Sequence, residues 1–255
     1  MDPRARDRAY SIAQPASSMT GTEKERLTLE GFYHSGGAPA IMRVAHIPDE
    51  LYPLLQMEAL VSLDTALRHN CDAIVELGCY DGRALEVAKA ARIPYYGVDI
   101  DPNAISTLER RISGESLSGT SKALLGDIRK SSTWSTSVDS ERPLHVIPFN
   151  LLGNLEKPAD LLRDLGDLGG FAVVSFFNEE QRTTTFRRLY YRACGIDPLE
   201  ESLGDYGGIL FTGGGGFCSQ SFSATGILSL LQEADLTPLQ ESSNQVGCCI
   251  TVNLR

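Results

Sequence analysis

The sequence predicts an α/β protein, a doubly wound three-layer sandwich built on a seven-stranded mixed sheet. In the middle of the chain, five short apolar runs alternate with helix-like segments, which is typical of parallel strands joined by crossover helices. The first run, Ile74 to Leu77, leads into the acidic, glycine-containing turn Gly78-Cys79-Tyr80-Asp81-Gly82. The chain ends in two strand-like runs joined by Ser242-Ser243-Asn244, a connection short enough for an antiparallel hairpin.

The alternation predicts five strands, at residues 73–77, 95–99, 122–125, 144–149 and 170–177. The helices between them are expected at residues 83–91, 101–112 and 158–165. The second of these helices begins with Asp101-Pro102, an N-cap residue followed by a proline at the first helical position. A further helix is expected before the sheet, over residues 48–69, where Pro48-Asp49-Glu50 supplies an acidic start.

Two segments are expected to lie outside the sandwich. Residues 1–47 are predicted to form an N-terminal arm, and residues 48–255 a single domain. Within that domain, residues 178–222 are predicted to form an insertion at the carboxyl edge of the strands, where open α/β sheets bind ligands. The elements expected from there on are an arginine-rich helix, a short strand, a second helix and two closing strands, at residues 181–194, 208–212, 223–233, 236–241 and 246–254.

Composition and charge limit the partners. The chain has 255 residues, 42% of them hydrophobic, and a formal net charge of −10. Proteins that bind nucleic acid usually carry a basic surface that contacts the phosphates. Because this chain is acidic, we expect no nucleic-acid partner. Residues 1–21 do not form a signal peptide and no apolar run is long enough for a membrane span, so we expect a cytoplasmic protein. The six cysteines show no CxxC spacing, which argues against structural zinc.

A ligand is expected at the ends of the first two strands. Gly78 and Gly82 allow close approach to the backbone. Asp99 ends the second strand, where an acid accepts hydrogen bonds from the hydroxyl groups of a ribose. A nicotinamide dinucleotide is the competing ligand, but the G-x-G-x-x-G fingerprint is absent and Tyr80 would crowd a pyrophosphate.

Segments in this order resemble class I S-adenosylmethionine-dependent methyltransferases over about residues 70–255. Glu76-Leu77-Gly78-Cys79-Tyr80-Asp81-Gly82 is similar to the family's first motif, with Tyr80 replacing the middle glycine as in catechol-type O-methyltransferases. Val98-Asp99 resembles the ribose-binding end of the second strand, and Gly126-Asp127-Ile128 resembles the adenine-binding turn. The segment from Asn150 to Asn154 is similar to the one that faces the methionine part and the acceptor.

The resemblance implies S-adenosylmethionine as the cofactor, with its methionine carboxylate on the free amides that open the helix after Gly82. The residues that it implies at the cofactor are Glu76, Gly78, Cys79, Tyr80, Gly82, Asp99, Ile100, Gly126, Asp127, Ile128 and Asn150. Glu76 is expected to support the turn from below, or simply to cap loop amides. Asp127 either contacts the adenine or is only the N-cap of a helix.

The same resemblance bears on the acceptor side. Metal-dependent catechol methyltransferases carry an aspartate at the end of the fourth strand, whereas Pro148-Phe149-Asn150 stands here, so we predict no metal. The candidate catalytic residues are two asparagines that could hold an amine or amide and two residues of an arm that could form a lid: Asn150, Asn154, Tyr33 and His34. Asn154 could equally start a turn, and Tyr33 and His34 could lie on a loose surface segment.

The predicted function is metal-independent methyl transfer from S-adenosylmethionine to oxygen or nitrogen of a small molecule, in secondary metabolism. Two alternatives stay open. The same cofactor could undergo cyclisation or cleavage that releases methylthioadenosine, or a degenerate fold could serve as a binding subunit. A homodimer is also left open, and the sequence does not identify the acceptor.

Overall fold

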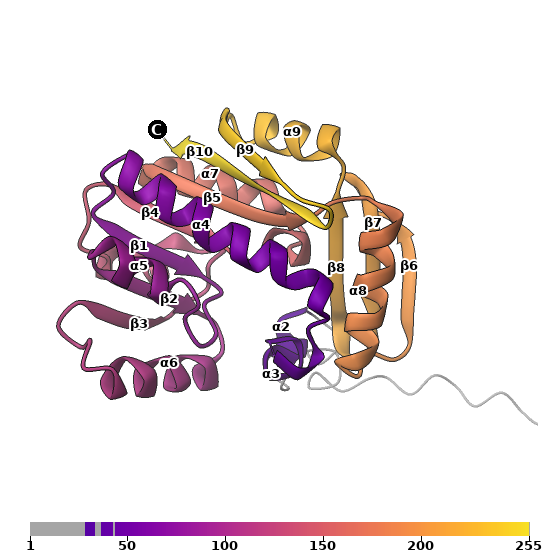
Figure 1. Cartoon of the computed structure of the whole chain (residues 1–255), viewed down its shortest axis with the longest axis horizontal. Helices are drawn as coiled ribbons and strands as arrows, with labels where there is room; N and C mark the ends of the chain where they lie inside the picture. Colours follow the sequence, from indigo (N-terminus) through magenta and orange to yellow (C-terminus); the bar gives the residue numbers. More distant parts are fainter. Residues whose placement is uncertain (1–28, 34–36, 43, 255) are drawn as a thin grey trace, which may run out of the picture.

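A computed structural model describes residues 29–33, 37–42 and 44–254 of the chain (Figure 1). In this part of the chain the main sheet has seven strands in the order β3-β2-β1-β4-β5-β10-β9. Strands β1 to β5 run parallel, whereas β10 is antiparallel to both β5 and β9, which confirms the predicted mixed sheet. The strands are β1 Ala73–Leu77, β2 Tyr95–Asp99, β3 Ser121–Leu125, β4 Pro143–Ile147, β5 Gly170–Phe177, β9 Pro238–Ser243 and β10 Gly247–Leu254.

Helices cover both faces of this sheet, because successive residues of a strand point to opposite faces. In β1, Ile74 belongs to the core under α4, α5 and α6, and Val75 belongs to the core under α7 and α9. The helices are α4 Tyr52–Arg68, α5 Leu85–Ala91, α6 Pro102–Gly114, α7 Pro158–Leu168 and α9 Ala224–Glu233. None of the described helices is long and apolar enough to cross a membrane.

Local sequence signals set most of these elements. Strands β1, β2 and β5 have the predicted bounds to the residue. Asp101 is the N-cap of α6, since its carboxylate accepts from the amide of Asn103 at 2.9 Å. The closing hairpin turns later than predicted: β9 runs on to Ser243, and Asn244 closes the turn by accepting from the amides of Val246 and Gly247.

The insertion contains a second sheet that the sequence does not predict. Its order is β6-β7-β8, formed by β6 Leu199–Leu203, β7 Gly207–Gly213 and β8 Phe217–Phe222. The prediction finds only β7, because β6 is a largely exposed edge strand of sequence Leu-Glu-Glu-Ser-Leu without apolar alternation. The glycine run between β7 and β8 forms a tight 3-10 turn over Gly214–Gly216.

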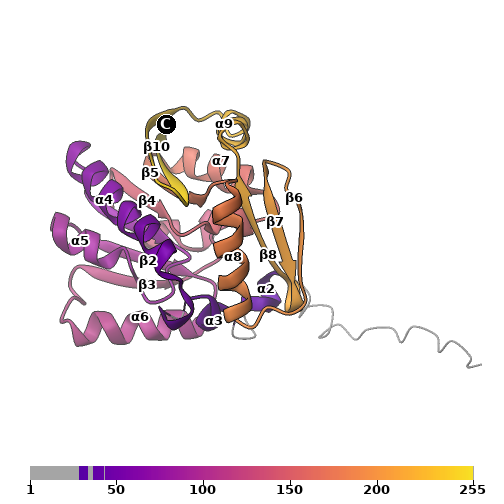
Figure 2. The same cartoon turned by 45° about the vertical axis from the view of Figure 1, so that its right-hand side comes forward.

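Helix α8, Gln181–Ala193, packs on this second sheet through Arg187, which is fully buried. The Arg187 guanidinium donates to the carbonyls of Ile209 and Ser219, at 3.0 and 2.6 Å. Figure 2 shows α8 and the second sheet beside the main sheet. The short helices α2 Leu29–Phe32 and α3 Ala38–Met42 lie near the lower ends of α8 and β8 in this view. The rings of Phe32 and Phe217 are 5.4 Å apart there.

Candidate functional site

A cavity lies where the carboxyl ends of β1 to β4 meet α2, α3 and the segment after β4. It measures about 920 Å³, including the space at its open mouth. This is the place in an open α/β sheet where ligands bind. The cavity is lined by Tyr33, Ile41, Met42, Gly78, Tyr80, Arg83, Asp99, Ile100, Asp127, Ile128, Arg129, Pro148, Phe149, Leu151, Asn154 and Leu155.

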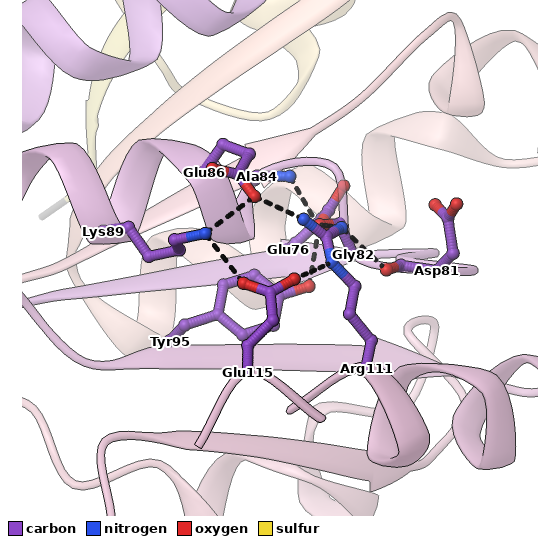
Figure 3. A network of polar contacts seen from close by, with 9 residues as sticks. All are labelled: Glu76, Asp81, Gly82, Ala84, Glu86, Lys89, Tyr95, Arg111 and Glu115. Atoms are coloured by element: carbon purple, nitrogen blue, oxygen red, sulfur yellow. Dashed lines mark hydrogen bonds and ion pairs between the residues drawn. The ribbon is translucent and has the colours of Figure 1, made fainter. Parts of the chain in front are cut away.

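The turn after β1 is supported from the side away from the cavity. The Glu76 carboxylate accepts from the amide of Ala84 at 3.0 Å and from the hydroxyl of Tyr95 at 2.6 Å. Arg111 of α6 donates to the carbonyls of Asp81 and Gly82, at 3.1 and 2.7 Å (Figure 3). Its guanidinium is held in turn by ion pairs with two glutamates, as Figure 3 shows. Glu76 thus caps a backbone amide and supports the turn, so these bonds fit both of the roles that the sequence leaves open for it.

Glycine is required in this turn at the position that faces the cavity. Gly78 has φ +66°, in the left-handed region that side chains disfavour. A Cβ there would also come within 2.9 Å of Leu151 Cδ2. Tyr80 occupies the left-handed region too, with φ +46°, although it carries a large side chain. At residue 78 the turn therefore presents its backbone to the cavity, with no side chain in between.

Three of the amides expected to be free at the start of α5 are already bonded within the protein, which argues against the predicted anion there. The amide of Ala84 is bonded to Glu76, that of Leu85 to the carbonyl of Gly82, and that of Glu86 to the carbonyl of Arg83. The protein's own carboxylate thus already occupies the helix start, which leaves no need for a second anion.

Asp99 lies at the end of β2 with its side chain at the cavity. It is 9% exposed, and burial raises the pKa of its carboxyl above the ordinary value. One carboxylate oxygen accepts from the amide of Tyr80 and the other from the amide of Asp101, both at 2.9 Å. The backbone amide of Ile100 also interacts with this carboxylate. A carboxylate has about four acceptor positions, so Asp99 can still accept a hydrogen bond from a ligand.

Asp127 also lines the cavity, but it is not the N-cap of a helix. Its carboxylate accepts from the backbone amide of Arg129 at 3.0 Å and from the Arg129 guanidinium at 2.8 and 2.9 Å. These bonds outweigh burial and hold the pKa of Asp127 below its usual value. Ile128 and Ile100 line the same end of the cavity.

Five of the predicted cofactor residues do not line the cavity: Glu76, Cys79, Gly82, Gly126 and Asn150. Glu76 and Gly82 belong to the support of the turn. Cys79 is 1% exposed, and its amide donates to the carbonyl of Val98 at 3.1 Å. Gly126 faces Trp134, since a Cβ at this glycine would come within 3.0 Å of Trp134 Cβ. These residues shape the cavity without lining it.

Asn150 is directed away from the cavity, which corrects its expected catalytic and cofactor roles. Its side-chain oxygen accepts from the amide of Phe177 at 3.0 Å, and its nitrogen donates to Gln220 O at 2.9 Å and to Ser219 Oγ at 3.1 Å. Phe149 and Asn150 have φ values of +41° and +63°, so two consecutive residues are left-handed. This backbone turn directs the Asn150 side chain into the protein, whereas Phe149 lines the cavity.

Tyr33 and Asn154, two of the predicted catalytic residues, meet at the cavity. Asn154 Nδ2 donates to the hydroxyl of Tyr33 at 2.8 Å, so the arm is tied to the segment after β4. Burial raises the pKa of the Tyr33 hydroxyl far above its ordinary value. Tyr33 is therefore a hydrogen-bond donor at neutral pH rather than a base. His34, the fourth predicted catalytic residue, lies outside the described residues.

Sequence reasoning missed several lining residues. Arg83 directly follows the glycine turn, so its place beside the cavity could have been inferred from that spacing. Phe149 was within reach of the same argument, because it follows the fourth strand. Ile41, Met42 and Leu155 carry no polar signal, and only the folded chain brings them together.

Glu76→Gln is expected to change how stability depends on pH. Burial raises the pKa of Glu76 from 4.5 to about 7, despite the opposing hydrogen bond from Tyr95. An acid with a raised folded-state pKa stabilises the fold fully below its unfolded pKa, and this stabilisation, about 3 kcal/mol at most, is lost as the pH rises towards 7. Glutamine keeps one acceptor oxygen for Ala84 and Tyr95 and never ionises.

Urea unfolding at pH 5 and pH 8 measures this effect. The variant should exceed the wild type in free energy of unfolding by about 1–3 kcal/mol at pH 8 and match it more closely at pH 5. Glu109→Gln, on the exposed side of α6, controls for the change in net charge. A difference between wild type and E76Q that does not vary with pH would contradict the assignment.

Comparisons with known proteins agree with this architecture. The family model described as "Methyltransferase domain" matches residues 55–241. No curated protein matches the chain. The structure of magnesium protoporphyrin IX methyltransferase from Synechocystis PCC 6803, with bound S-adenosylhomocysteine, is similar with TM-score 0.59 and 11% identity, over 88% of this chain and 97% of that one.

Two further structures share the fold. A Burkholderia thailandensis 1,6-didemethyltoxoflavin-N1-methyltransferase, solved with that compound and S-adenosylhomocysteine, has TM-score 0.55 and 11% identity, covering 96% of this chain and 98% of that one. The [4+2]-cyclase SpnF has TM-score 0.51 and 12% identity, covering 76% of this chain and 80% of that one. The resemblance to class I S-adenosylmethionine-dependent methyltransferases is confirmed, and because the family model spans most of the sheet and its edge cavity, the chain belongs to the Methyltransferase domain family.

Proposed function

We propose that this protein binds S-adenosylmethionine in the cavity at the strand ends and transfers its methyl group to a small-molecule acceptor without a metal. The observation that carries the proposal is the position of Asp99, whose carboxylate lines the cavity beside a glycine turn and can still accept from a ligand. On this proposal Asp99 holds the ribose hydroxyls, and Ile128 and Ile100 contact the adenine. Asp127 can accept from the adenine amino group only in competition with Arg129.

The residues present fit the cofactor along the whole edge. From β3 through β2 and β1 to β4, the cavity offers apolar side chains, then a carboxylate, then a backbone turn without a Cβ, then an arginine and the Phe149 ring. A nucleoside with a zwitterionic tail carries groups complementary to these, in the same order. When bound, the cofactor supplies an electrophilic methyl group on a sulfonium.

The acceptor would lie between the arm and the segment after β4. Ile41, Met42, Phe149 and Leu155 make this space apolar, with the Tyr33 and Asn154 pair as its polar end. Methyl transfer from a sulfonium is an in-line displacement, so holding the acceptor in line accounts for much of the rate. Since Tyr33 keeps its proton, the acceptor should be an amine, a ring nitrogen or an acidic oxygen that needs no strong base.

Several finer expectations belong to this proposal. They are a lid formed by residues 1–47, a single domain over residues 48–255 with its insertion on the substrate side, cytoplasmic location, secondary metabolism, absence of nucleic-acid partners and a homodimer. Residues 1–28 and 34–36 of this arm lie outside the described residues. In its described part, the hydrogen bond from Asn154 to Tyr33 supports the lid. The named small-molecule substrates of the two similar methyltransferases support a small acceptor.

A second candidate function keeps the cofactor and changes the chemistry. The part of the cavity lining that the structure describes contains no histidine, and a [4+2]-cyclase shares the fold. The same pocket could therefore promote cleavage or cyclisation of S-adenosylmethionine, or hold it as a scaffold for rearrangement of another compound. A degenerate binding subunit is less favoured, because Gly78 and Asp99 both keep their places at the cavity.

Calorimetry with S-adenosylhomocysteine tests the proposal. We expect the full chain to bind it with a dissociation constant in the micromolar range, about −8 kcal/mol. Incubation with S-adenosylmethionine and a panel of amines, heteroaromatics and phenols should give S-adenosylhomocysteine only when an acceptor is present. Methylthioadenosine formed without an acceptor would support the second candidate, and no binding at high micromolar concentration would contradict both.

A further inference from the structure

Two arginines line the cavity, and they differ in how they are paired. Arg129, beyond β3, is held by the carboxylate of Asp127 at 2.8 Å. Arg83 follows the turn after β1, and its guanidinium carbon lies 5.2 Å from the centroid of the Phe149 ring. Because Phe149 follows β4, Arg83 marks the β1–β4 end of the cavity, opposite to Asp127 and Arg129.

The hydrogen bonding of Arg83 is incomplete. Its Nη2 forms an ion pair with Glu58 Oε1 at 3.5 Å, a distance at the limit of a hydrogen bond. Its Nη1 is buried and has no hydrogen-bond partner in the described part of the chain. Glu58 cannot simply move closer, because its other oxygen accepts from the amide of Phe149 at 2.7 Å. A guanidinium nitrogen left in this state is costly, and a turn of the guanidinium towards an incoming anion in the cavity would satisfy it.

The competing anion site is closed. Glu76 already accepts from the amide of Ala84 at the start of α5. The acids that line the cavity, Asp99 and Asp127, lie at the ends of β2 and β3. At the β1–β4 end, Arg83 is therefore the group of the described lining that attracts negative charge.

We propose that Arg83 binds the α-carboxylate of the cofactor's amino-acid end. The inference rests on the proposed function: with the ribose at Asp99 and the adenine towards β3, the amino-acid end extends over Gly78 towards β4, where Arg83 lies. The planar guanidinium can donate two parallel hydrogen bonds to a carboxylate, which a lysine cannot reproduce.

A matched pair of ligands tests this inference by binding alone. S-adenosylhomocysteine and its decarboxylated form, which keeps the amine and lacks only the carboxylate, are titrated into the full chain by calorimetry. The wild type should bind the first at least about tenfold more tightly, since a hydrogen bond to a charged group contributes about 1.5–3 kcal/mol. Arg83→Met should weaken S-adenosylhomocysteine by about 10–100-fold and the decarboxylated ligand by less than about threefold.

Two further variants complete the design. Arg83→Lys keeps the charge and loses the planar fork, so its affinity should fall between those of wild type and Arg83→Met. Arg110→Met removes an arginine from the exposed face of α6 and should leave both affinities unchanged. If Arg83→Met does not fold, because Glu58 loses its partner, the wild type and Arg83→Lys decide the question.

The outcomes separate the two proposals. A wild type that binds both ligands equally, or an Arg83→Met protein that loses both equally, overturns the role of Arg83 and leaves the proposed function standing. A wild type that binds neither ligand overturns the proposed function, and the role of Arg83 with it.

Discussion

Asp99→Ala is expected to weaken binding of S-adenosylhomocysteine by at least about 100-fold. Asp99 lines the cavity at the end of β2, and its carboxylate can still accept from ribose hydroxyls beside the amides of Tyr80 and Asp101 that it binds. Two hydrogen bonds from ribose hydroxyls to a partly buried carboxylate contribute about 1.5–3 kcal/mol each, and 3 kcal/mol corresponds to somewhat more than 100-fold in affinity. Calorimetry on the wild type and the variant measures the change.

The same substitution removes two backbone caps, so controls must separate ligand contact from loss of the turn. Asp72→Ala is a matched control: it removes a carboxylate that accepts from Ser140, Glu141 and Arg142 at the opposite edge of the sheet. That variant should bind S-adenosylhomocysteine as the wild type does.

A ligand without ribose hydroxyls completes the test. The 2′,3′-dideoxy analogue should bind the wild type weakly and should lose little further affinity in Asp99→Ala. If Asp99→Ala binds S-adenosylhomocysteine within about tenfold of the wild type, the ribose does not lie at Asp99 and the cavity must be interpreted anew.

The first two strands and the turn between them could be predicted because their signals are local. All five side chains of β1 are buried, and so are those of β2, so each reads as a short apolar run. The turn carries its glycines where the backbone is left-handed, at Gly78 and Gly82. Asp99 follows from the position at which β2 ends.

The second sheet could not be predicted, because it depends on pairing between distant segments. β6 is mostly exposed and polar, and β8 follows a glycine run, so neither shows a clear strand pattern. What holds this part together is the guanidinium of Arg187, bonded to carbonyls of β7 and β8. In the sequence, Arg187 belongs to an arginine-rich segment that looks like an exposed helix face.

Asn150 shows that the position of a motif can be predicted from the sequence when the direction of one of its side chains cannot. The resemblance places residues 150–154 beside the cavity, and Leu151 and Asn154 do line it. The direction of Asn150 is decided by its left-handed backbone and by its bonds to Phe177 and Gln220, which lie far along the chain. No local pattern in the sequence carries that information.

Asn150→Ala is therefore expected to destabilise the fold, by at least about 3 kcal/mol, rather than to abolish a chemical step. The amide of Phe177 and the carbonyl of Gln220 would each lose a partner in the interior, at about 1–3 kcal/mol each. Alanine at φ +63° adds about 1–2 kcal/mol, because its Cβ crowds the following carbonyl in the left-handed region. Urea unfolding of wild type and variant measures the sum.

Asn150→Gly separates the two contributions, since glycine removes the same hydrogen bonds and accepts the left-handed backbone. It should be more stable than Asn150→Ala by about 1 kcal/mol and still clearly less stable than the wild type. A residue that touched the cofactor would behave differently: Asn150→Ala would then keep its stability to within about 1 kcal/mol and lose more than about tenfold in affinity for S-adenosylhomocysteine. That second pattern would restore Asn150 to the site, and it would mean that the bonds to β5 and β8 contribute little to the fold.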